Sequence, residues 1–290
     1  MPLPALLPDE PGEIETPLGR LEVDRTERGL RVRFREGVPE GPRELEIFSA
    51  ALSEEQFVER WRRTFRSESK FPSAVSLSRW EAGRVLSFSR GAVRVDDLHS
   101  RLLVPIAAPR APRLAELFGI DVDLLARAFG IVGDPEPERP EAVLTAYLET
   151  EAAPEGAFAA IATRERYIAL LRGVAEVRSA GETSHGWRLT LEPPDAPPAG
   201  EPGATLSEEV ACDPARRELR IRRRAGDSLF DSVYRAERRE GRTYLVRQAI
   251  LAGAREDLLR NDSLRGRLAG ALAVDLLAWA RRLEGREERR

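Results

Sequence analysis

The side chains that most often carry proton transfer, nucleophilic attack or metal binding are scarce in this chain. Its 290 residues include two histidines, His99 and His185, and one cysteine, Cys212. A general base or a nucleophile needs a partner group close by, and a zinc site needs three or four ligands. Neighbours in the sequence supply neither, so we expect no catalytic residue and no metal site. We expect His99 in a solvated turn, His185 in a structural role facing inward near a sheet edge, and Cys212 as a half-buried, inert thiol.

Arginine offers a different chemistry, the recognition of anions. The stretch RRELRIRRR, from Arg216 to Arg224, holds six arginines in nine residues. Alternation along a strand puts Leu219 and Ile221 on the core face together with Arg223. The other face would be in water, where Glu237 or Glu240 of the following strand could pair with it. The surplus positive charge makes these residues candidates for binding an anion: Arg220, Arg222, Arg223 and Arg224.

Arginine is also the default cation of this protein, which weakens any argument that begins from an arginine. Lys70 is the only lysine among 46 basic residues, and Asn261 is the only asparagine. We interpret this as the codon bias of a GC-rich, bacterial genome. Bidentate pairing and stacking, the usual reasons to choose arginine over lysine, therefore lose diagnostic value here.

Overall composition indicates a folded, cytoplasmic protein. Hydrophobic residues make up 42% and charged residues 33%, and a net charge of −3 argues against nucleic acid as a partner. One cysteine allows no internal disulfide framework, which fits a reducing compartment. The start, MPLPALLPDEPGEIE, lacks the positive residues of a secretory signal, and no apolar run reaches the roughly eighteen residues of a spanning helix.

Hydrophobic periodicity predicts strands through much of the first half. LGRLEVD and GLRVRFREG alternate with period two and predict a hairpin joined by residues 25–28. ELEIFSA and the apolar segments between residues 74 and 106 predict further strands. PRLAELFGIDVDLLARAFGIVG predicts one or two short helices. SEEQFVERWRRTF predicts another helix, because Ser53 and Gln56 match a capping box and Phe57, Trp61 and Phe65 recur on one face.

The second half is predicted as helix, antiparallel strands, helix. Residues 141–173 have a helical pattern, with Phe158, Ile161, Ile168 and Leu171 facing inward. HGWRLTLE is followed by a proline-rich loop and then by four predicted strands, TLSEEVAC, ELRIRRR, DSVYRAER and RTYLVRQAI. A long amphipathic helix is predicted from Asp262, with an apolar stripe of Leu264, Leu268, Leu272, Leu276, Trp279 and Leu283.

These elements predict an α+β protein, with antiparallel sheets packed against helices in two modules. GDPEPERPE, residues 133–141, has the composition of a linker. We therefore expect an N-terminal module over residues 1–132 and a C-terminal module over residues 142–290. A long helix across a curved antiparallel sheet is the economical way to bury both apolar faces of the second module. Whether the two halves are a diverged duplication stays open.

By element order, residues 150–290 resemble the helix-grip fold, also called START-like or SRPBCC. The resemblance rests on the helical entry, the sheet ending in YLVRQAILA and the final helix from Asp262 to Glu284. It implies that an apolar ligand is held between helix and sheet. GRTYLVRQAILAG followed by an amphipathic helix also resembles the end of the secretion-chaperone fold, but AGDSLF leaves no room for the helix expected between its middle strands.

A third resemblance implies an enzyme. ELEIF, with Glu44 and Glu46, and the strands GLRVRF and ELRIRR are similar to the triphosphate-tunnel family, in which an ExExK strand binds metal and arginines hold phosphates. Phe48 stands in place of the lysine, which removes a phosphate-facing cation. No phosphate-binding loop and no GxSxG or HExxH motif is present.

We therefore expect a cytoplasmic binding protein rather than an enzyme, without a cofactor, that binds a hydrophobic small molecule, a lipid or a partner protein. The alternatives are a secretion-chaperone-like module and a tunnel-like enzyme acting on phosphorylated substrates. Oligomeric state stays open. The residues expected to line a ligand site are Trp187, Leu189, Tyr234, Tyr244, Leu272 and Trp279.

Overall fold

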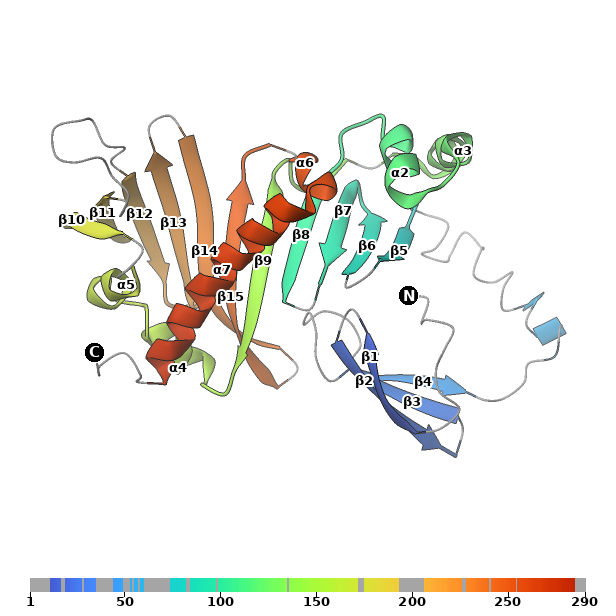
Figure 1. The fold of residues 1–290 in the computed structure, drawn as a ribbon, viewed down its shortest axis with the longest axis horizontal. Helices are drawn as coiled ribbons and strands as arrows, with labels where there is room; N and C mark the ends of the chain where they lie inside the picture. Colours follow the sequence, from blue (N-terminus) through green and yellow to red (C-terminus); the bar gives the residue numbers. More distant parts are fainter. Residues whose placement is uncertain are drawn as a thin grey trace. The chain divides into compact units, whose positions relative to one another are not determined.

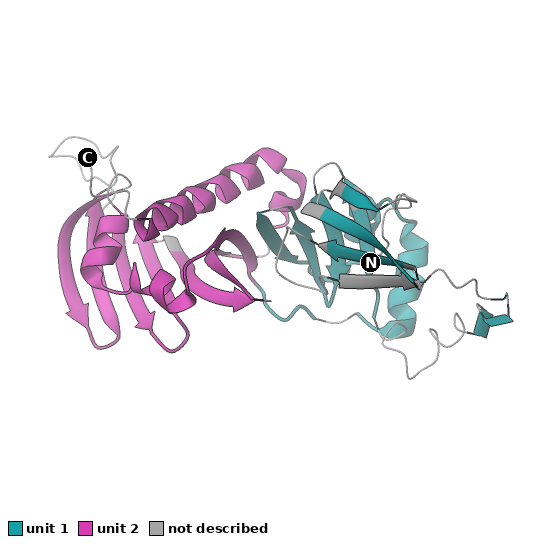
Figure 2. Ribbon diagram, turned by 90° about the horizontal axis from the view of Figure 1, so that it is seen from below, with its two compact units in different colours: residues 1–140 teal, residues 141–290 magenta. Residues whose placement is uncertain are grey.

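The chain forms two compact units, residues 1–140 and 141–290, which are coloured separately in Figure 2. The computed structural model describes residues 11–16, 19–27, 29–34, 44–48, 53, 55–56, 58–59, 74–81, 84–97, 99–134, 136–171, 175–192, 206–225, 228–239, 241–253 and 255–284. Both units combine antiparallel strands with helices, so the α+β class predicted from the sequence is confirmed.

Four antiparallel strands form the first sheet of the N-terminal unit, in the order β1-β2-β3-β4. They are β1 (Gly12–Thr16), β2 (Gly19–Thr26), β3 (Gly29–Phe34) and β4 (Glu44–Phe48). The predicted hairpin is present, and its alternation buries Leu21, Val23 and Val32. Strand β1 was not expected, because it follows directly on a proline-rich segment.

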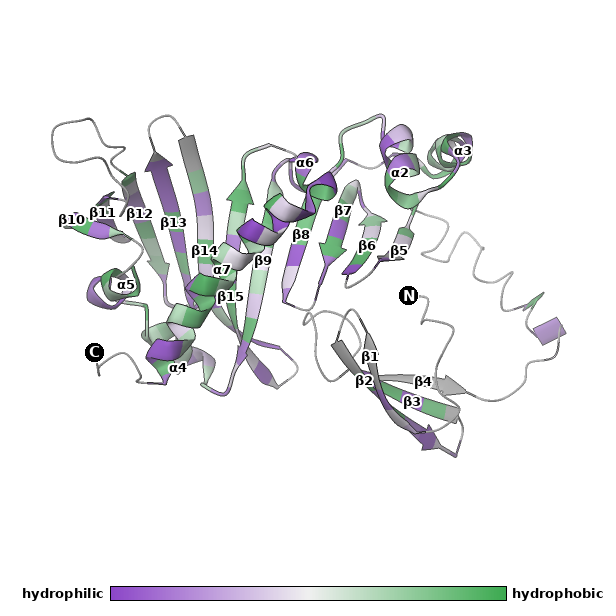
Figure 3. Cartoon of the chain, viewed as in Figure 1, coloured by the Kyte–Doolittle hydropathy of each residue, from purple (hydrophilic) through white to green (hydrophobic). Residues whose placement is uncertain are grey.

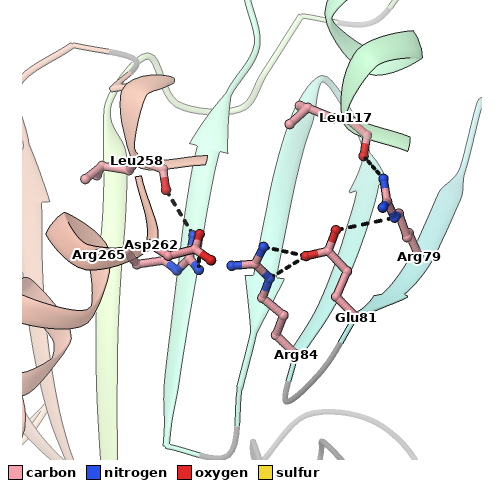
Figure 4. A network of polar contacts seen from close by, with 7 residues as sticks. All are labelled: Arg79, Glu81, Arg84, Leu117, Leu258, Asp262 and Arg265. Carbon is pink, nitrogen blue, oxygen red and sulfur yellow. Dashed lines mark hydrogen bonds and ion pairs between the residues drawn. The ribbon is translucent and has the colours of Figure 1, made fainter. Parts of the chain in front are cut away.

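The remaining described strands of this unit form a four-stranded meander, in the region where the apolar segments between residues 74 and 106 predict strands. Its strands are β5 (Leu77–Glu81), β6 (Arg84–Ser89), β7 (Ala92–Asp96) and β8 (Ser100–Pro105). Helices α2 (Ala111–Phe118) and α3 (Val122–Val132) follow, where one or two short helices were expected. Arg79 of β5 donates from Nη1 to the carbonyl of Leu117 at 3.0 Å and pairs with Glu81, which also binds Arg84 (Figure 4).

The acidic segment after α3 is held against the N-terminal unit by two arginines. Arg110 is fully buried; it donates to the carbonyl of Ile106 at 2.7 Å and pairs with Asp134. Arg90 forms an exposed ion pair with Glu138 at 3.1 Å. Part of the segment predicted to be a linker, residues 133–141, is therefore held in place by ion pairs.

The predicted helix that begins near residue 53 is described only at its start. The backbone N–H of Ser53 donates to Gln56 Oε1 at 3.1 Å, and the N–H of Gln56 donates to the Ser53 hydroxyl at 3.2 Å. The capping box expected from the sequence is thus formed. Phe57, Trp61 and Phe65 lie outside the described residues.

The C-terminal unit is a seven-stranded antiparallel sheet with a long final helix lying across β15 and β9 (Figure 1). Its strand order is β10-β11-β12-β13-β14-β15-β9. The strands are β9 (Ala142–Thr150), β10 (Glu176–Thr183), β11 (Gly186–Glu192), β12 (Leu206–Asp213), β13 (Glu218–Ala225), β14 (Ser228–Arg239) and β15 (Arg242–Leu251). The helices are α4 (Pro154–Ala159), α5 (Arg164–Leu170), α6 (Asp257–Arg260) and α7 (Asp262–Leu283).

Helix α7 begins and packs as its sequence predicts. The side chain of Asn261 accepts a hydrogen bond from the backbone N–H of Leu264 at 2.9 Å, which caps the helix. Arg265 in its first turn donates to the carbonyl of Leu258 (Figure 4). Hydrophobic residues gather in the C-terminal half of α7 (green in Figure 3), and those buried are Leu272, Leu276 and Trp279.

Some expectations for the C-terminal unit are wrong, and one strand was missed. Residues 142–150 form strand β9 rather than helix; side chains on both of its faces are buried, so no strand alternation marks the sequence. Ile168 is only half-buried, and Tyr167 takes the inward position on α5. Edge strand β10 was missed because its side chains are almost all exposed, and the sequence EVRSAGET therefore carries no apolar pattern.

A buried polar cluster as candidate functional site

The pairing register of β11 to β15 assigns each side chain to one of two faces of the sheet. We call the face covered by α7 the inner face, because Trp279 and Asp275 of α7 contact Tyr234 and Arg247 on it. Cα partners on neighbouring strands share a face. The inner face carries Trp187, Leu189, Glu208, Val210, Leu219, Ile221, Arg223, Phe230, Ser232, Tyr234, Leu245 and Arg247.

Four aromatic rings run in a chain between the inner face and α7. The ring centroids of Trp187 and Tyr167 are 5.9 Å apart, those of Tyr167 and Tyr234 are 6.3 Å apart, and those of Tyr234 and Trp279 are 5.8 Å apart. All four residues are buried, and Trp279 Nε1 donates to the carbonyl of Ala157 at 2.9 Å. The Tyr167–Tyr234 and Tyr234–Trp279 pairs are edge-to-face, a geometry that stabilises aromatic pairs, whereas the Trp187–Tyr167 pair is tilted.

Five of the six residues expected to line a ligand site belong to this layer. Trp187, Tyr234 and Trp279 are members of the aromatic chain. Leu189 on the inner face and Leu272 on α7 are buried as well. Tyr244 does not join them: it pairs in register with Glu237 on β14 and with Glu149 on β9, which places it on the opposite face of the sheet.

Glu208 forms the centre of a polar cluster on the inner face. Arg223 of β13, its Cα partner, donates from Nε to Glu208 Oε1 at 2.7 Å, and Tyr167 of α5 donates its hydroxyl to Glu208 Oε2 at 3.0 Å. Glu208 has an exposed fraction of 0%. A carboxylate is retained at such a depth because a cation and a phenol both bind it.

A second acid–base pair lies on the same face. Arg247 donates from Nε to Asp275 Oδ2 at 3.0 Å, and its guanidinium carbon lies 4.2 Å from the centroid of the Tyr234 ring. The side chain of Arg247 is almost fully buried, whereas that of Asp275 is half-buried. Cation–π contact and ion pairing together compensate for the desolvation of the guanidinium.

Burial changes the acidity of two tyrosines in the cluster. Desolvation, followed by the negative charge of Glu208, raises the pKa of Tyr167 well above its ordinary value. Desolvation also raises the pKa of Tyr234, against the opposing effect of Arg247. Both hydroxyls therefore stay protonated at neutral pH, as hydrogen-bond donors.

Exposure increases along one row of the inner face that crosses four neighbouring strands. The row consists of Leu189, Glu208, Arg223 and Phe230, which are successive Cα partners. Leu189 and Glu208 are fully buried, the Arg223 side chain keeps 34% of its surface exposed, and Phe230 keeps 49%. The cluster is therefore open to solvent at Arg223 and Phe230.

Arg220, Arg222 and Arg224 lie on the outer face, as alternation predicts, whereas Arg216 and Arg217 lie in the turn before β13. Hydrophilic residues mark β13 in Figure 3. Of the two acidic partners expected for these arginines, Glu237 binds Arg235 and Arg239 instead, and Glu240 lies outside the described residues. Arg220 pairs with Glu218, and Arg222 pairs with Asp231 at 3.0 Å. Within the described residues, Arg224 is exposed and has no ion pair.

The histidines and the cysteine contribute nothing to the cluster. His99 lies exposed in a turn, as expected, and its backbone N–H donates to Asp97. His185 is exposed in the turn before β11, so its expected inward position is wrong. Cys212 is half-buried, and burial raises the pKa of its thiol. No group of three or more acidic, histidine or cysteine residues suited to a metal occurs in the described part of the chain.

The register of the first sheet bears on the tunnel-like alternative. Arg31 is the Cα partner of Glu46 and Arg33 that of Glu44. The side chains of both glutamates lie outside what the structure describes. The four described strands form an open sheet in the order β1-β2-β3-β4.

Four polar members of the cluster were not identified from the sequence: Tyr167, Glu208, Arg247 and Asp275. Glu208 did carry a signal, because in TLSEEVAC it shares strand parity with Leu206 and Val210. Arg247 likewise shares parity with Leu245. The pairing of these charges depends on strand register and helix placement, which periodicity does not specify.

Comparison with known proteins identifies solved structures similar to part of this chain. The Zhui aromatase/cyclase from Streptomyces sp. R1128 is 19% identical, with a TM-score of 0.34, and covers 51% of this chain and 94% of its own. Truncated norcoclaurine synthase from Thalictrum flavum is 15% identical, with a TM-score of 0.34, covering 48% and 91%. The Aha1 dimer from Colwellia psychrerythraea is 14% identical, with a TM-score of 0.34, covering 49% and 96%.

These similarities assign no function to this chain. No model of a protein family matches it, and no curated protein matches it in sequence. Among the helices that the structure describes, none has the length and apolar character needed to cross a membrane.

Proposed function

We propose that the C-terminal unit binds a small organic molecule on the inner face of its sheet, beside helix α7. The observation that carries this proposal is the Glu208–Arg223 ion pair, which is fully buried at its acidic end and exposed to solvent at its basic end. Binding sites for small molecules are mostly apolar, with a few convergent polar groups. The row from Leu189 to Phe230 combines two apolar side chains with one ion pair, beside the buried aromatic rings of Trp187 and Tyr234.

The energetic cost of the cluster supports a functional role. Two charges removed from water are seldom more stabilising than apolar side chains of similar size. Here two acid–base pairs and two phenols lie on one inner face, although Leu, Ile or Val would fill the same positions without desolvation. Groups with strongly perturbed pKa values concentrate at functional sites, and Tyr167 and Tyr234 are such groups.

An unpaired donor also supports binding in this layer. The indole Nε1 of Trp187 is buried and has no hydrogen-bond partner among the described residues. Burying such a donor without a partner is unfavourable by about 1–3 kcal/mol. A bound molecule with an acceptor atom would satisfy it. The hydrophobic small molecule or lipid expected from the sequence is therefore narrowed to an amphipathic molecule that carries an acceptor.

Native mass spectrometry of the full chain, purified from its own host, tests the proposal. We expect a bound small molecule in the wild type and in Val274→Asp, which alters an exposed apolar residue on α7 away from the inner face. Phe230→Asp should lose it, because the charge lies at the open end of the row. Retention of the bound mass by Phe230→Asp would contradict the proposal.

A further inference from the structure

We infer that the ligand of the inner face is an aromatic acid, whose carboxylate is bound by Arg223 and whose ring contacts Phe230. This inference deepens the proposed function and rests on it. It depends on three properties of the open end of the row: which hydrogen-bonding groups are already occupied, which sign of charge faces solvent, and which apolar surface lies next to that charge.

The hydrogen-bonding groups favour a ligand that supplies acceptors. Both oxygens of Glu208 already accept, one from Arg223 and the other from Tyr167, and this carboxylate has no exposed surface. The unsatisfied groups are donors. Trp187 Nε1 has no partner among the described residues, and Arg223 contacts Glu208 through Nε and Nη2, so its Nη1 takes no part in this ion pair. At the open end of the row, therefore, the groups left for a ligand are donors, which favours a ligand that supplies acceptors.

The charge that a ligand meets first is positive. Arg223 and Glu208 neutralise each other overall, but only the arginine reaches solvent. In the second pair on this face, Arg247 with Asp275, the acid is the more exposed partner, so within the described residues of this face the positive charge that reaches solvent is confined to Arg223 at the open end of the row. Glu208 also fixes the orientation of the guanidinium, whose planar arrangement of donors matches the two oxygens of a carboxylate. Arg223 is therefore presented as a preorganised anion-binding group, with Glu208 as its positioning residue.

The apolar surface next to Arg223 is aromatic. Phe230 is the Cα partner of Arg223 on β14, which brings the two side chains to neighbouring positions on the inner face. Nearly half of Phe230 is exposed, an unusual state for phenylalanine. The half-buried Ser232 follows on the same face. An aromatic ring held by its carboxylate at Arg223 would cover Phe230 in an offset or edge-to-face arrangement.

Isothermal titration of the full chain with matched naphthalene derivatives tests the inference. We expect 1-naphthoate to bind at least about tenfold more tightly than 1-naphthylmethanol, which has the same ring without the charge. The cation 1-naphthylmethylammonium should bind more weakly than the alcohol. Arg223→Met should reduce the affinity for naphthoate to that for the alcohol and leave the alcohol unaffected.

Arg224→Met is the matched control, because the neighbouring arginine lies exposed on the other face of the same strand. It should leave all three affinities unchanged. Since Arg223→Met isolates a buried carboxylate, the double variant Glu208→Gln/Arg223→Met is measured alongside it, with thermal unfolding as the check that each variant is folded. The double variant should show the same loss of preference for the acid.

The outcomes separate this inference from the proposed function. Equal affinity for naphthoate and naphthylmethanol would overturn the aromatic acid and leave a small-molecule site standing. A preference for the acid that survives both variants of Arg223 would also overturn it, because the anion would then be bound elsewhere. If no naphthalene derivative binds at all, the inference fails, and the proposed function is decided separately by the native mass spectrometry of the wild type and Phe230→Asp.

Discussion

Glu208 and Arg223 form an ion pair inside the C-terminal sheet in which the carboxylate is fully buried while the guanidinium reaches solvent. Their contact, 2.7 Å from Nε to Oε1, joins neighbouring strands β12 and β13. Because the two partners differ so much in exposure, the two halves of the pair should respond differently to mutation.

Arg223→Met should be the more damaging of the two single substitutions. It leaves a buried carboxylate uncompensated, and we expect the free energy of unfolding to fall by about 3–5 kcal/mol. Glu208→Gln should lower it by less, because the amide keeps hydrogen-bonding capacity and Arg223 can regain water. Urea unfolding measures both. A larger loss for Glu208→Gln would show that the guanidinium, rather than the carboxylate, depends on the pair.

Trp279→Phe should loosen the attachment of α7. The substitution removes the hydrogen bond from Nε1 to the carbonyl of Ala157 and part of a fully buried ring. We expect a loss of about 2 kcal/mol in the free energy of unfolding. Val274→Ala on the exposed side of the same helix should change it by less than about 0.5 kcal/mol. Similar effects of the two substitutions would refute the role given to Trp279.

Gly186→Ala should disturb the pairing of β11 with β12. A Cβ at this position would lie 2.0 Å from the carbonyl oxygen of Val210, so the backbone must shift. Overpacking of this kind costs about 1–3 kcal/mol. Gly181→Ala in edge strand β10 is the control, since a Cβ there meets no atom within 4 Å. Equal stability of the two variants, measured by thermal unfolding, would argue against the close approach.

Stability should fall in alkaline solution because of Tyr167 and Tyr234. Burial raises the pKa of both above the ordinary value of 10.0, so above that pH the unfolded chain loses protons that the native chain retains. The stabilisation is fully present below about pH 10 and is lost as the pH rises further, at about 1.4 kcal/mol per pH unit for each tyrosine.

Urea unfolding between pH 9 and pH 11.5 measures this slope. Cys212 shifts stability in the same direction, because burial also raises the pKa of its thiol, so the series is made in a Cys212→Ala background. Tyr167→Phe/Tyr234→Phe should remove most of the slope. An unchanged slope in that variant would mean that other groups cause the alkaline loss.

The sequence predicted the fold best for elements with one buried face and one face exposed to solvent. Leu219 and Ile221 alternate with arginines in β13, and the structure buries the first two and exposes Arg220, Arg222 and Arg224. Where both faces are covered, as in β9, or both are exposed, as in β10, alternation disappears and the prediction failed.

The candidate site was harder to predict from the sequence, because it consists of contacts between residues on different elements rather than of a sequence motif. Parity places Arg223 on the apolar face, but it does not show that Glu208 lies opposite it on β12. That relation depends on strand register, which is set by turns and packing across the whole sheet. Tyr167 comes from α5, about forty residues earlier in the chain, and binds Glu208 only through tertiary packing.

Titration of the full chain with 8-anilinonaphthalene-1-sulfonate, an aromatic anion that fluoresces in apolar surroundings, tests small-molecule binding at the inner face most directly. We expect a saturable rise in fluorescence for the wild type and for Val274→Asp. Phe230→Asp should bind the dye at least about tenfold more weakly than the wild type. Equal affinity in all three proteins, or a loss confined to Val274→Asp, would contradict this expectation and place the apolar binding surface outside the inner face.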